Sequence, residues 1–305
     1  MSQSASDETA KVVIAGGSGF IGRRLAALLA ANGTQVVVLT RSTTPPDVGS
    51  VSFAQWDGET PGDWCQHLAS ATAVVNLCGA SIAGKRWSDA RKRELQDSRT
   101  RPTTALVAAC NECSSPPAVF LQASGVGYYG IGNTECTETS GAGSDFLAQL
   151  AIAWERPLGD LSIRSVTMRL GVVLGKAGGA LPQMLLPFRF FAGGPIASGN
   201  QWLSWIHLFD AVAAMVFFMD HADSSGPCNL VAPNPLRNHT FAELSGKILR
   251  RPNWLPTPRF MMKALLGEQS TLLCDGQQVT PAQLLKTPFT FRYPTLEKAL
   301  LDLTS

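Results

Sequence analysis

The chain has 305 residues, of which 45% are hydrophobic, and this is enough to bury a sizeable core in one large domain or two coupled ones. Its formal net charge is +2 and only 16% of its residues are charged. It therefore lacks the broad basic surface that nucleic acids or anionic membranes attract. We expect neither as a partner.

Simple features also predict the compartment and the metal content. The N-terminal stretch reads "MSQSASDETAK", which is polar and has no apolar core, so no secretory or transit signal is expected and the protein is predicted to be cytoplasmic. The most apolar stretch, residues 180–195, carries three prolines and is shorter than the ~20 residues that a bilayer crossing needs. Seven scattered cysteines are typical of reduced thiols. The single CxxC, Cys110 and Cys113, closes a predicted helix, so no metal site is expected.

The first forty residues predict a strand, a helix and a second strand in succession. They read "KVVIAG" (11–16), then "RRLAALLAANG" (23–33) with helical apolar spacing, then "QVVVLTRS" (35–42). Further buried strands are predicted at 73–80, 118–125 and 165–175, with helices at 88–113 and 144–160. This alternation predicts an α/β fold with a doubly wound parallel sheet.

The texture changes near residue 179, where prolines, paired glycines and aromatic residues accumulate. We predict a nucleotide-binding domain over 11–178 and a smaller substrate-binding domain over 179–305. A helix-like stretch (207–221) and a strand-like stretch (228–233) indicate that residues 203–232 return to the first domain.

Three glycines stand between the first predicted strand and helix. Gly16, Gly19 and Gly22 have the spacing GxxGxxG, which permits a tight turn and a close approach of the backbone to a pyrophosphate at the helix N-terminus. Because the flanking strand, helix and second strand are all present, the motif predicts a Rossmann dinucleotide site rather than a merely tight turn.

The end of the second strand indicates which dinucleotide is bound. A carboxylate there would favour NAD by accepting hydrogen bonds from the ribose hydroxyl, whereas this chain has Thr40, Arg41 and Ser42. Arg41 can grip a 2′-phosphate through two N–H groups, so NADP(H) is predicted as the cofactor. The alternative is that Arg41 is a solvated loop charge.

Several motifs in order resemble the extended short-chain dehydrogenase/reductase superfamily, in its NAD(P)-dependent epimerase/dehydratase branch. They are "GGSGFIG", "NLCGA", "ASGVGYYG", "MRLGVVLG" and "WIHLFDAV". A poorly characterised epimerase-like subfamily is matched more closely by "NLCGASIAGKRWSDARKREL", "GNQWLSWIHLFD" and a C-terminal module of the DUF1731 type. The resemblance covers nearly the whole chain from residue 11 and implies, by analogy, a homodimer.

The resemblance also implies roles for individual positions. The cofactor-binding positions it implies are Gly16, Ser18, Gly19, Phe20, Ile21 and Gly22 at the pyrophosphate, Arg41 at the adenosine phosphate, Asp57 at the adenine edge, and Leu77, Cys78 and Gly79 at the adenine ribose. Ser124 matches the active-site serine that hydrogen-bonds a substrate carbonyl or hydroxyl.

The chain departs from this superfamily at its general acid/base. That group is a tyrosine followed four residues later by a lysine, which lowers the tyrosine pKa. Here the three tyrosines, Tyr128, Tyr129 and Tyr293, are followed at that spacing by glycine, asparagine and glutamate. Phe146 and Leu150, or Leu147 and Ala151 if the register is taken from Glu155, stand where the pair would be.

Other side chains are candidates for the missing chemistry. Tyr129 is either a displaced general acid or a packing residue, and His207 either exchanges a proton with substrate or is a structural hydrogen-bonder at a helix start. Glu135 and Glu138 are interpreted as solvated loop carboxylates rather than residues that enter the site, and the basic segment 84–101 as a solvated helix face rather than an anion-binding patch. Arg86 is the predicted contact for an anionic substrate. An apolar wall is predicted from Phe188, Phe190, Phe191, Trp202 and Trp205, with Trp202 and His207 as substrate contacts.

Two functional hypotheses follow. In the first, the protein is an NADP(H)-dependent oxidoreductase or epimerase-like enzyme in which Ser124, with Tyr129, orients a small carbonyl or hydroxyl substrate against the nicotinamide. In the second, it is a non-catalytic NADP(H) sensor, which the missing Tyr–Lys pair favours. The substrate and the reaction direction do not follow from the sequence.

Overall fold

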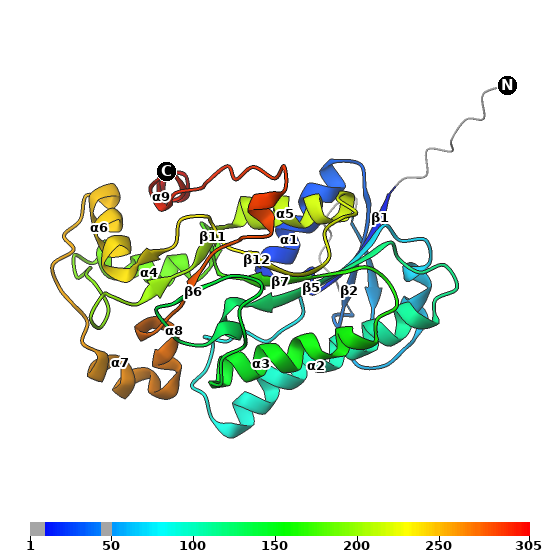
Figure 1. Ribbon diagram of the computed structural model, residues 1–305, viewed down its shortest axis with the longest axis horizontal. Helices are drawn as coiled ribbons and strands as arrows, with labels where there is room; N and C mark the ends of the chain where they lie inside the picture. The colour runs from blue at the N-terminus through cyan, green and yellow to red at the C-terminus, as the bar shows by residue number, and fades with distance from the viewer. Residues whose placement is uncertain (1–9, 44–50) are drawn as a thin grey trace.

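A seven-stranded parallel sheet forms the centre of the molecule in the computed structural model, which describes residues 10–43 and 51–305 (Figure 1). The strands follow the order β12-β7-β5-β4-β1-β2-β3. From β1 the chain adds β2 and β3 on one side and then crosses back to add β4 on the other side of β1. Their bounds are β1 Lys11–Ala15, β2 Gln35–Thr40, β3 Val51–Gln55, β4 Ala73–Asn76, β5 Val119–Gly125, β7 Ser165–Leu170 and β12 Gly226–Leu230. The predicted doubly wound α/β fold is confirmed.

Helices cover both faces of this sheet (Figure 1). On one face α1 (Phe20–Ala31) packs against α5 (Leu208–Asp220), and on the other α2 (Asp89–Glu112) packs against α3 (Phe146–Glu155). Alternate residues of each strand serve the two layers. In β1, Val12 and Ile14 join the core under α1 and α5, whereas Val13 and Ala15 join the core under α2. A sheet buried on both faces explains why its strands read as continuous apolar runs.

Three elements differ from the sequence prediction. Residues 165–175 form two strands, because the chain changes hydrogen-bonding partners at Gly171. The Gly171 N–H still donates to the carbonyl of Leu230, the last residue of β12, whereas the Val172 N–H donates to the carbonyl of Ser204 and starts β8 (Val172–Gly175) in another sheet. Strand β3 was not predicted at all. The helix predicted over 144–160 ends as α3 at Glu155 and continues as a 3-10 turn over Arg156–Asp160.

The rest of the chain forms a second cluster of small elements. A hydrophobic core joins α4 (Leu181–Arg189), α6 (Asn238–Leu249) and α9 (Leu296–Thr304). The small strands are β6 Glu135–Cys136, β9 Gly178–Gly179, β10 Trp202–Leu203, β11 Trp205–His207, β13 Leu236–Arg237 and β14 Gln278–Val279, and the remaining helices are α7 Arg259–Leu266 and α8 Thr271–Cys274. Short 3-10 turns occupy 63–68, 126–129, 267–270 and 284–286.

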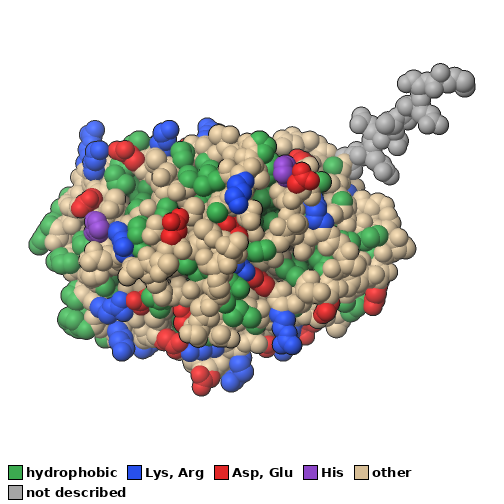
Figure 2. Space-filling view, in the orientation of Figure 1, with side chains coloured by type: hydrophobic (Ala, Val, Ile, Leu, Met, Phe, Trp, Pro, Cys, Tyr) green, Lys and Arg blue, Asp and Glu red, His purple; other side chains and the backbone are tan. Residues whose placement is uncertain are grey.

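The surface is mixed in character. On the face shown in Figure 2, Lys and Arg side chains are interspersed with Asp and Glu. Within residues 10–43 and 51–305, no helix combines the length and the apolar character that a membrane crossing demands.

Candidate active site

The turn between β1 and α1 requires glycine at two positions where the backbone leaves no room for a side chain. Gly16 has a φ of +78°, and a Cβ on it would lie 2.7 Å from the carbonyl of Leu77. A Cβ on Gly22 would lie 2.6 Å from Cα of Gly17 and also meet the carbonyl of Gly16. Gly19 caps α1 without any side-chain hydrogen bond, so the first N–H groups of the helix remain available to an anion. The cradle therefore fits a dinucleotide pyrophosphate.

The residues that flank this turn differ in how accessible they are to a ligand. Ser18 and Gly19 are exposed, and Ile21 is half-buried. The Phe20 ring packs against the glycines of the β8–β9 hairpin, where a Cβ on Gly178 would lie 2.6 Å from its Cδ2. Phe20 could therefore meet a pyrophosphate through its backbone only.

Residues beyond β2 and β4 lie around the predicted adenosine side. Arg41 is exposed directly after β2. Burial raises the pKa of the Cys78 thiol, and the charge of Arg41 acts against that rise. The Leu77 N–H donates to the carbonyl of Ala15 at 2.9 Å, which brings the loop after β4 against the glycine turn.

Asp57 holds a turn of its own. Its Oδ1 accepts from the N–H groups of Glu59 and Thr60 at 2.7 and 2.8 Å, and Oδ2 accepts from the Thr60 hydroxyl. The Thr60 hydroxyl and these backbone bonds lower the pKa of Asp57 to about 2. Asp57 is exposed, so this ionised turn could still present an oxygen to an adenine edge.

Arg99 is a buried cation that the sequence reading missed. It lies on α2 and is 7% exposed, and its guanidinium donates to the carbonyls of Leu95 (2.8 Å) and Ala80 (3.1 Å) and stacks on Trp154 at 4.8 Å. Burial, reinforced by Arg91, lowers its pKa to about 10. Among the described residues Arg99 forms no ion pair. The predicted wet helix face is thus wrong for Arg91 and Arg99, although Arg101 and Asp97 do pair at i,i+4.

Ser124 sits at the end of β5 in a buried polar network. Ser124 is 2% exposed, and its hydroxyl donates to Glu155 Oε1 at 2.6 Å. Arg169 on β7 grips the same carboxylate with two donors, Nε at 2.9 Å and Nη2 at 2.8 Å. Burial disfavours the Arg169 cation, but Glu155 and Tyr129 outweigh it and raise the arginine pKa above its usual range. The network therefore holds a charged pair directly behind the Ser124 hydroxyl.

Tyr129 belongs to the same network but is fully engaged. Its hydroxyl donates its only proton to Asn229 Oδ1 at 2.6 Å and accepts from Arg169 Nη1 at 3.1 Å. Burial raises the tyrosine pKa despite the opposing effect of Arg169. Tyr129 is therefore a poor proton donor to substrate, and the structure favours the packing role over the displaced general acid.

Glu138 extends this network to the C-terminal segment. It is 7% exposed, so its interpretation as a solvated carboxylate was wrong, whereas Glu135 is exposed. Glu138 Oε1 accepts from the N–H of Asn229 at 3.0 Å. The Asn229 amide donates in turn to the carbonyl of Thr280 at 3.0 Å.

The contact between Ser124 and Glu155 favours one of the two registers considered for α3. Residues four apart share one helix face, so Leu147 and Ala151 lie on the face of Glu155. Leu147 packs against Gly127, whose Cβ would lie 3.0 Å from the leucine Cβ. This favours the Leu147/Ala151 register for the positions of the tyrosine and lysine, and both residues are apolar.

Arg86 lies on a loop that touches the C-terminal segment. A Cβ on Gly267 would lie 2.9 Å from Arg86 Nη2, and the Gln269 amide donates to the Ile82 carbonyl at 3.0 Å. Beyond this contact, Trp87 and Phe146 meet edge to face with centroids 4.9 Å apart. The loop after β4 and the C-terminal segment are thus in direct contact.

The predicted aromatic wall does not form as one surface. Phe188 and Trp205 are in the core at 2% and 0% exposure, whereas Phe190 and Phe191 face solvent. Trp202 remains half-buried, stacked on the Arg237 guanidinium at 3.8 Å, and its Nε1 has no hydrogen-bond partner among the described residues. These aromatic residues are near one another in the sequence but not in space, because the chain turns between α4 and β10.

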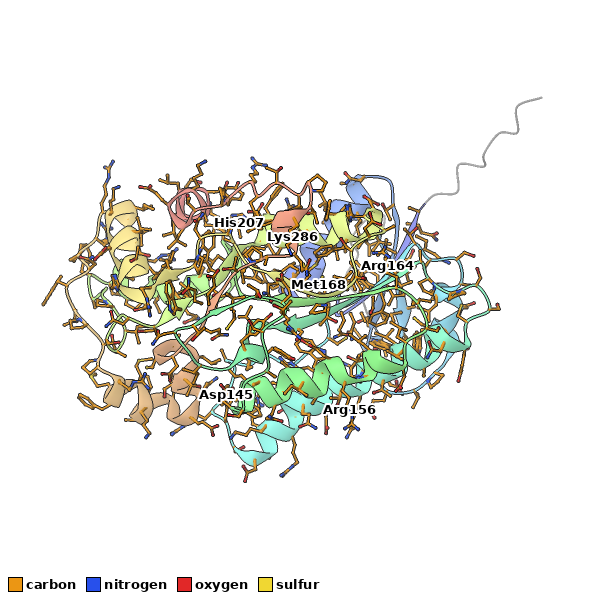
Figure 3. The ribbon with its side chains drawn as sticks, viewed as in Figure 1. Asp145, Arg156, Arg164, Met168, His207 and Lys286 are labelled. Carbon is orange, nitrogen blue, oxygen red and sulfur yellow. The ribbon has the colours of Figure 1, made fainter. Side chains whose placement is uncertain are left out.

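His207 lies on the opposite side of the sheet from the Ser124 network. Figure 3 shows it above the sheet, while Asp145 and Arg156, at the two ends of α3, lie below. Its Nδ1 accepts from the N–H of Phe209 at 3.0 Å and so caps α5. The predicted substrate contact for His207 is therefore not part of this site.

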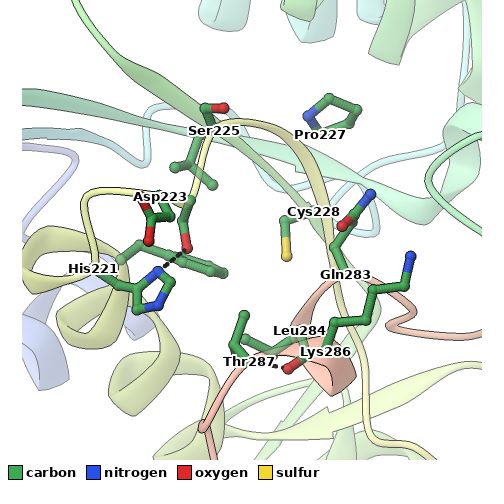
Figure 4. Close-up of a pocket in the computed structure, with 12 residues that line it drawn as sticks. His221, Asp223, Ser225, Pro227, Cys228, Gln283, Leu284, Lys286 and Thr287 are labelled. Atoms are coloured by element: carbon green, nitrogen blue, oxygen red, sulfur yellow. Dashed lines mark hydrogen bonds between the residues drawn. The ribbon is translucent and has the colours of Figure 1, made fainter.

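A small cavity of about 180 Å³ lies elsewhere, between the end of α5, β12 and the turn at 284–286 (Figure 4). In it the His221 Nδ1 and the Ser224 hydroxyl are 3.1 Å apart. No cluster of three or more His, Cys, Asp or Glu suited to a metal occurs in the part of the chain that the structure describes.

Burial raises the pKa of the Cys110 thiol to about 12, so this thiol is unreactive near pH 7.

Comparisons with known proteins agree with this architecture. Residues 12–231 match the NAD dependent epimerase/dehydratase family, and residues 257–303 match a domain of unknown function, DUF1731. Epimerase family protein YfhF of Bacillus subtilis is 36% identical over 299 residues, which cover 96% of this chain and 97% of that protein. The chloroplastic epimerase family protein SDR39U1 homolog of Arabidopsis thaliana is 38% identical over 301 residues, covering 95% and 85%.

Solved structures show the same fold. Human epimerase family protein SDR39U1, crystallised with NADPH, superposes with a TM-score of 0.88 at 34% identity and covers 96% of this chain and 98% of its own. MoeE5 in complex with UDP-glucuronic acid and NAD superposes with a TM-score of 0.77 over 97% of this chain and 99% of its own. At 19% identity, the MoeE5 likeness concerns the fold alone.

Proposed function

Because the chain belongs to the NAD-dependent epimerase/dehydratase family, we propose that it is an NADP(H)-dependent oxidoreductase or epimerase-like enzyme acting on a small carbonyl or hydroxyl substrate. The observation that carries this proposal is the Ser124 hydroxyl backed by the Glu155–Arg169 pair at the carboxyl end of β5. In doubly wound sheets this edge is where ligands bind.

The cofactor would lie across the carboxyl ends of β1, β2 and β4. The glycine cradle would hold its pyrophosphate, and Arg41 would pair with a 2′-phosphate. The human relative SDR39U1 was crystallised with NADPH, which supports the same choice here. Arg99 would place a buried positive charge under the β4 loop, where it donates to the carbonyl of Ala80.

Ser124 would handle the proton of the substrate. NADP(H), when bound, supplies or accepts the hydride. During oxidation of an alcohol, the substrate hydroxyl would give its proton to Ser124 Oγ while Ser124 gives its own to Glu155, and reduction would run this transfer in reverse. Arg169 would orient the Glu155 carboxylate with two hydrogen bonds, and Tyr129 would position Arg169. Trp202 Nε1, which lacks a partner among the described residues, offers a donor to substrate.

The cofactor choice is tested with the substitution Arg41→Glu. We expect NADPH to bind roughly 10- to 100-fold more weakly, because a charge-assisted bond to phosphate contributes about 1.5–3 kcal/mol. Affinity for NADH should change little. The measurement is a fluorescence titration with both cofactors. Arg93→Glu makes the same change in net charge on an exposed face of α2 and should leave both affinities unchanged. An equal loss in the two variants would contradict a 2′-phosphate contact by Arg41.

The catalytic role is tested with the substitution Ser124→Ala. Loss of a positioned proton-transfer group typically lowers kcat by about 10²–10⁴-fold, so we expect a fall in that range with cofactor affinity unchanged. The measurement follows the oxidation of NADPH by its absorbance at 340 nm, in the presence of a panel of carbonyl compounds. Ser225→Ala, an exposed serine at the small cavity, is the control. Wild-type activity in Ser124→Ala would refute this mechanism.

One observation favours a second candidate function, a non-catalytic NADP(H) sensor. The α3 face toward Ser124 carries Leu147 and Ala151, and the adjacent Phe146 packs against Trp87. The two functions separate in the same assay. Tight NADPH binding without oxidation by any carbonyl, together with a cofactor-dependent change of assembly, would favour the sensor.

A further inference from the structure

A second groove lies on the opposite side of the sheet from Ser124, Glu155 and Arg169, and the proposed reaction does not use it. Its volume is about 760 Å³, within the range of small-molecule sites. Four segments enclose it: α1, the turn after β8, the start of α5, and the C-terminal segment that runs into α9. Its lining includes Phe20, Arg23, Arg24, Lys176, His207, Phe209, Arg292, Tyr293 and Asp302. None of Ser124, Glu155, Arg169 and Arg41 lines it.

Positive charge gathers in this groove. Arg23 and Arg24 lie three and four residues after Phe20, so all three side chains lie along one face of α1. Among the described residues, neither Arg23 nor Arg24 forms an ion pair, and nor does Arg292. Three arginines thus face one lining carboxylate, Asp302, while the Lys176 ammonium donates to the terminal backbone oxygen of Ser305.

Part of this charge is held in place before any ligand arrives. The Arg292 guanidinium lies 4.9 Å from the Phe209 ring centroid and 5.6 Å from that of Tyr293. An arginine stacked on aromatic faces loses less freedom on binding, and its planar fork matches phosphate oxygens.

His207 supplies a buried donor at the same wall. It is 5% exposed and stacks on Tyr293 with centroids 3.9 Å apart. Because Nδ1 accepts from the Phe209 N–H, the neutral ring carries its proton on Nε2. Nε2 lies 3.3 Å from Asp302 Oδ2 but makes no aligned hydrogen bond to any described residue. Burial lowers the His207 pKa despite Asp302 and Asp210, which keeps the ring neutral.

We propose that this groove binds a small molecule bearing a di- or triphosphate group, at a site separate from the cofactor. Unpaired guanidiniums along one wall, a stacked arginine on the other and a buried imidazole donor between them suit several adjacent negative charges. Phe20 is the link to the cofactor turn, because its backbone belongs to the turn and its ring to the groove. Any effect of one ligand on the other would therefore be reciprocal.

The test uses inorganic triphosphate as the probe, since it lacks the adenosine that a cofactor site would recognise. Calorimetric titration of the full chain, with and without saturating NADP+, should show one triphosphate bound per chain in both conditions. Arg24→Gln and Arg292→Gln should each weaken binding by 10-fold or more. Arg93→Gln, an exposed arginine outside the groove, should leave it unchanged. Thermal unfolding of each variant checks that it is folded.

Several outcomes would overturn the site. They are displacement of triphosphate by NADP+, equal weakening in Arg93→Gln and Arg24→Gln, and no binding to the folded wild-type chain. Comparing a nucleoside triphosphate with inorganic triphosphate identifies the source of the phosphate. Tighter binding of the nucleotide assigns a base-recognising site, and equal binding assigns a site for the phosphate group alone. The proposed reaction can fail without affecting this result, because triphosphate binding does not require turnover.

Discussion

Gly22→Ala is expected to weaken NADPH binding strongly while leaving a folded protein. A Cβ on Gly22 would overlap Cα of Gly17 at 2.6 Å, and that neighbour is backbone, which cannot swing aside. The turn must therefore open, and the N–H groups of α1 lose their alignment on the pyrophosphate. Losing two hydrogen bonds to a charged group, at about 1.5 kcal/mol each, predicts a fall in NADPH affinity on the order of 100-fold.

Gly159→Ala is the matched control for this experiment. Nothing lies within 4 Å of a Cβ at Gly159, which is on the 3-10 turn after α3. Both variants are titrated with NADPH by fluorescence, and both are unfolded with denaturant. NADPH affinity in Gly22→Ala equal to that of Gly159→Ala would show that the cofactor does not use this turn.

The fold could be predicted because its signals are local. Apolar runs of strand length alternate with helical patterns, and each was read from a few neighbouring residues. The family resemblance and the doubly wound sheet are confirmed for the same reason. Strand β3 was missed because its five residues, "VSFAQ", mix exposed and buried positions at the sheet edge and follow no continuous apolar run. The change of sheet at Gly171 depends on partners near residues 204 and 230, which no local pattern contains.

The candidate site was only partly predictable. Ser124 was found because a motif surrounds it, but Glu155 and Arg169 were not. They are distant from Ser124 in the sequence and meet it only when α3 packs over β5 and β7. Arg99 was hidden in a helix whose composition indicates a solvated face. Its burial follows from the neighbouring Trp154 and the loop after β4, and both contacts are tertiary.

Breaking the Glu155–Arg169 pair is expected to cost more stability than any exposed pair in the described residues. The two side chains are 16% and 5% exposed, with N and O atoms 2.8 Å apart. Glu155→Leu would leave the arginine charge buried and unpaired, which typically costs about 3–5 kcal/mol in the free energy of unfolding. Glu297→Leu, which breaks the exposed pair with Lys247, should cost less than about 1 kcal/mol. Denaturant unfolding measures both. Similar losses would contradict the burial of the Glu155–Arg169 pair.

The double variant Glu155→Leu/Arg169→Met separates the role of the pair in stability from its role at the site. Removing both charges also removes the buried unpaired cation, so the double variant should be more stable than Glu155→Leu alone. Ser124 would still lack its acceptor, and Tyr129 would lose the donor that reaches it at 3.1 Å. We therefore expect stability to recover without turnover. Turnover that recovers together with stability would show that the pair only supports the fold. Recovery of stability alone would show that the charge pair serves the proton of Ser124.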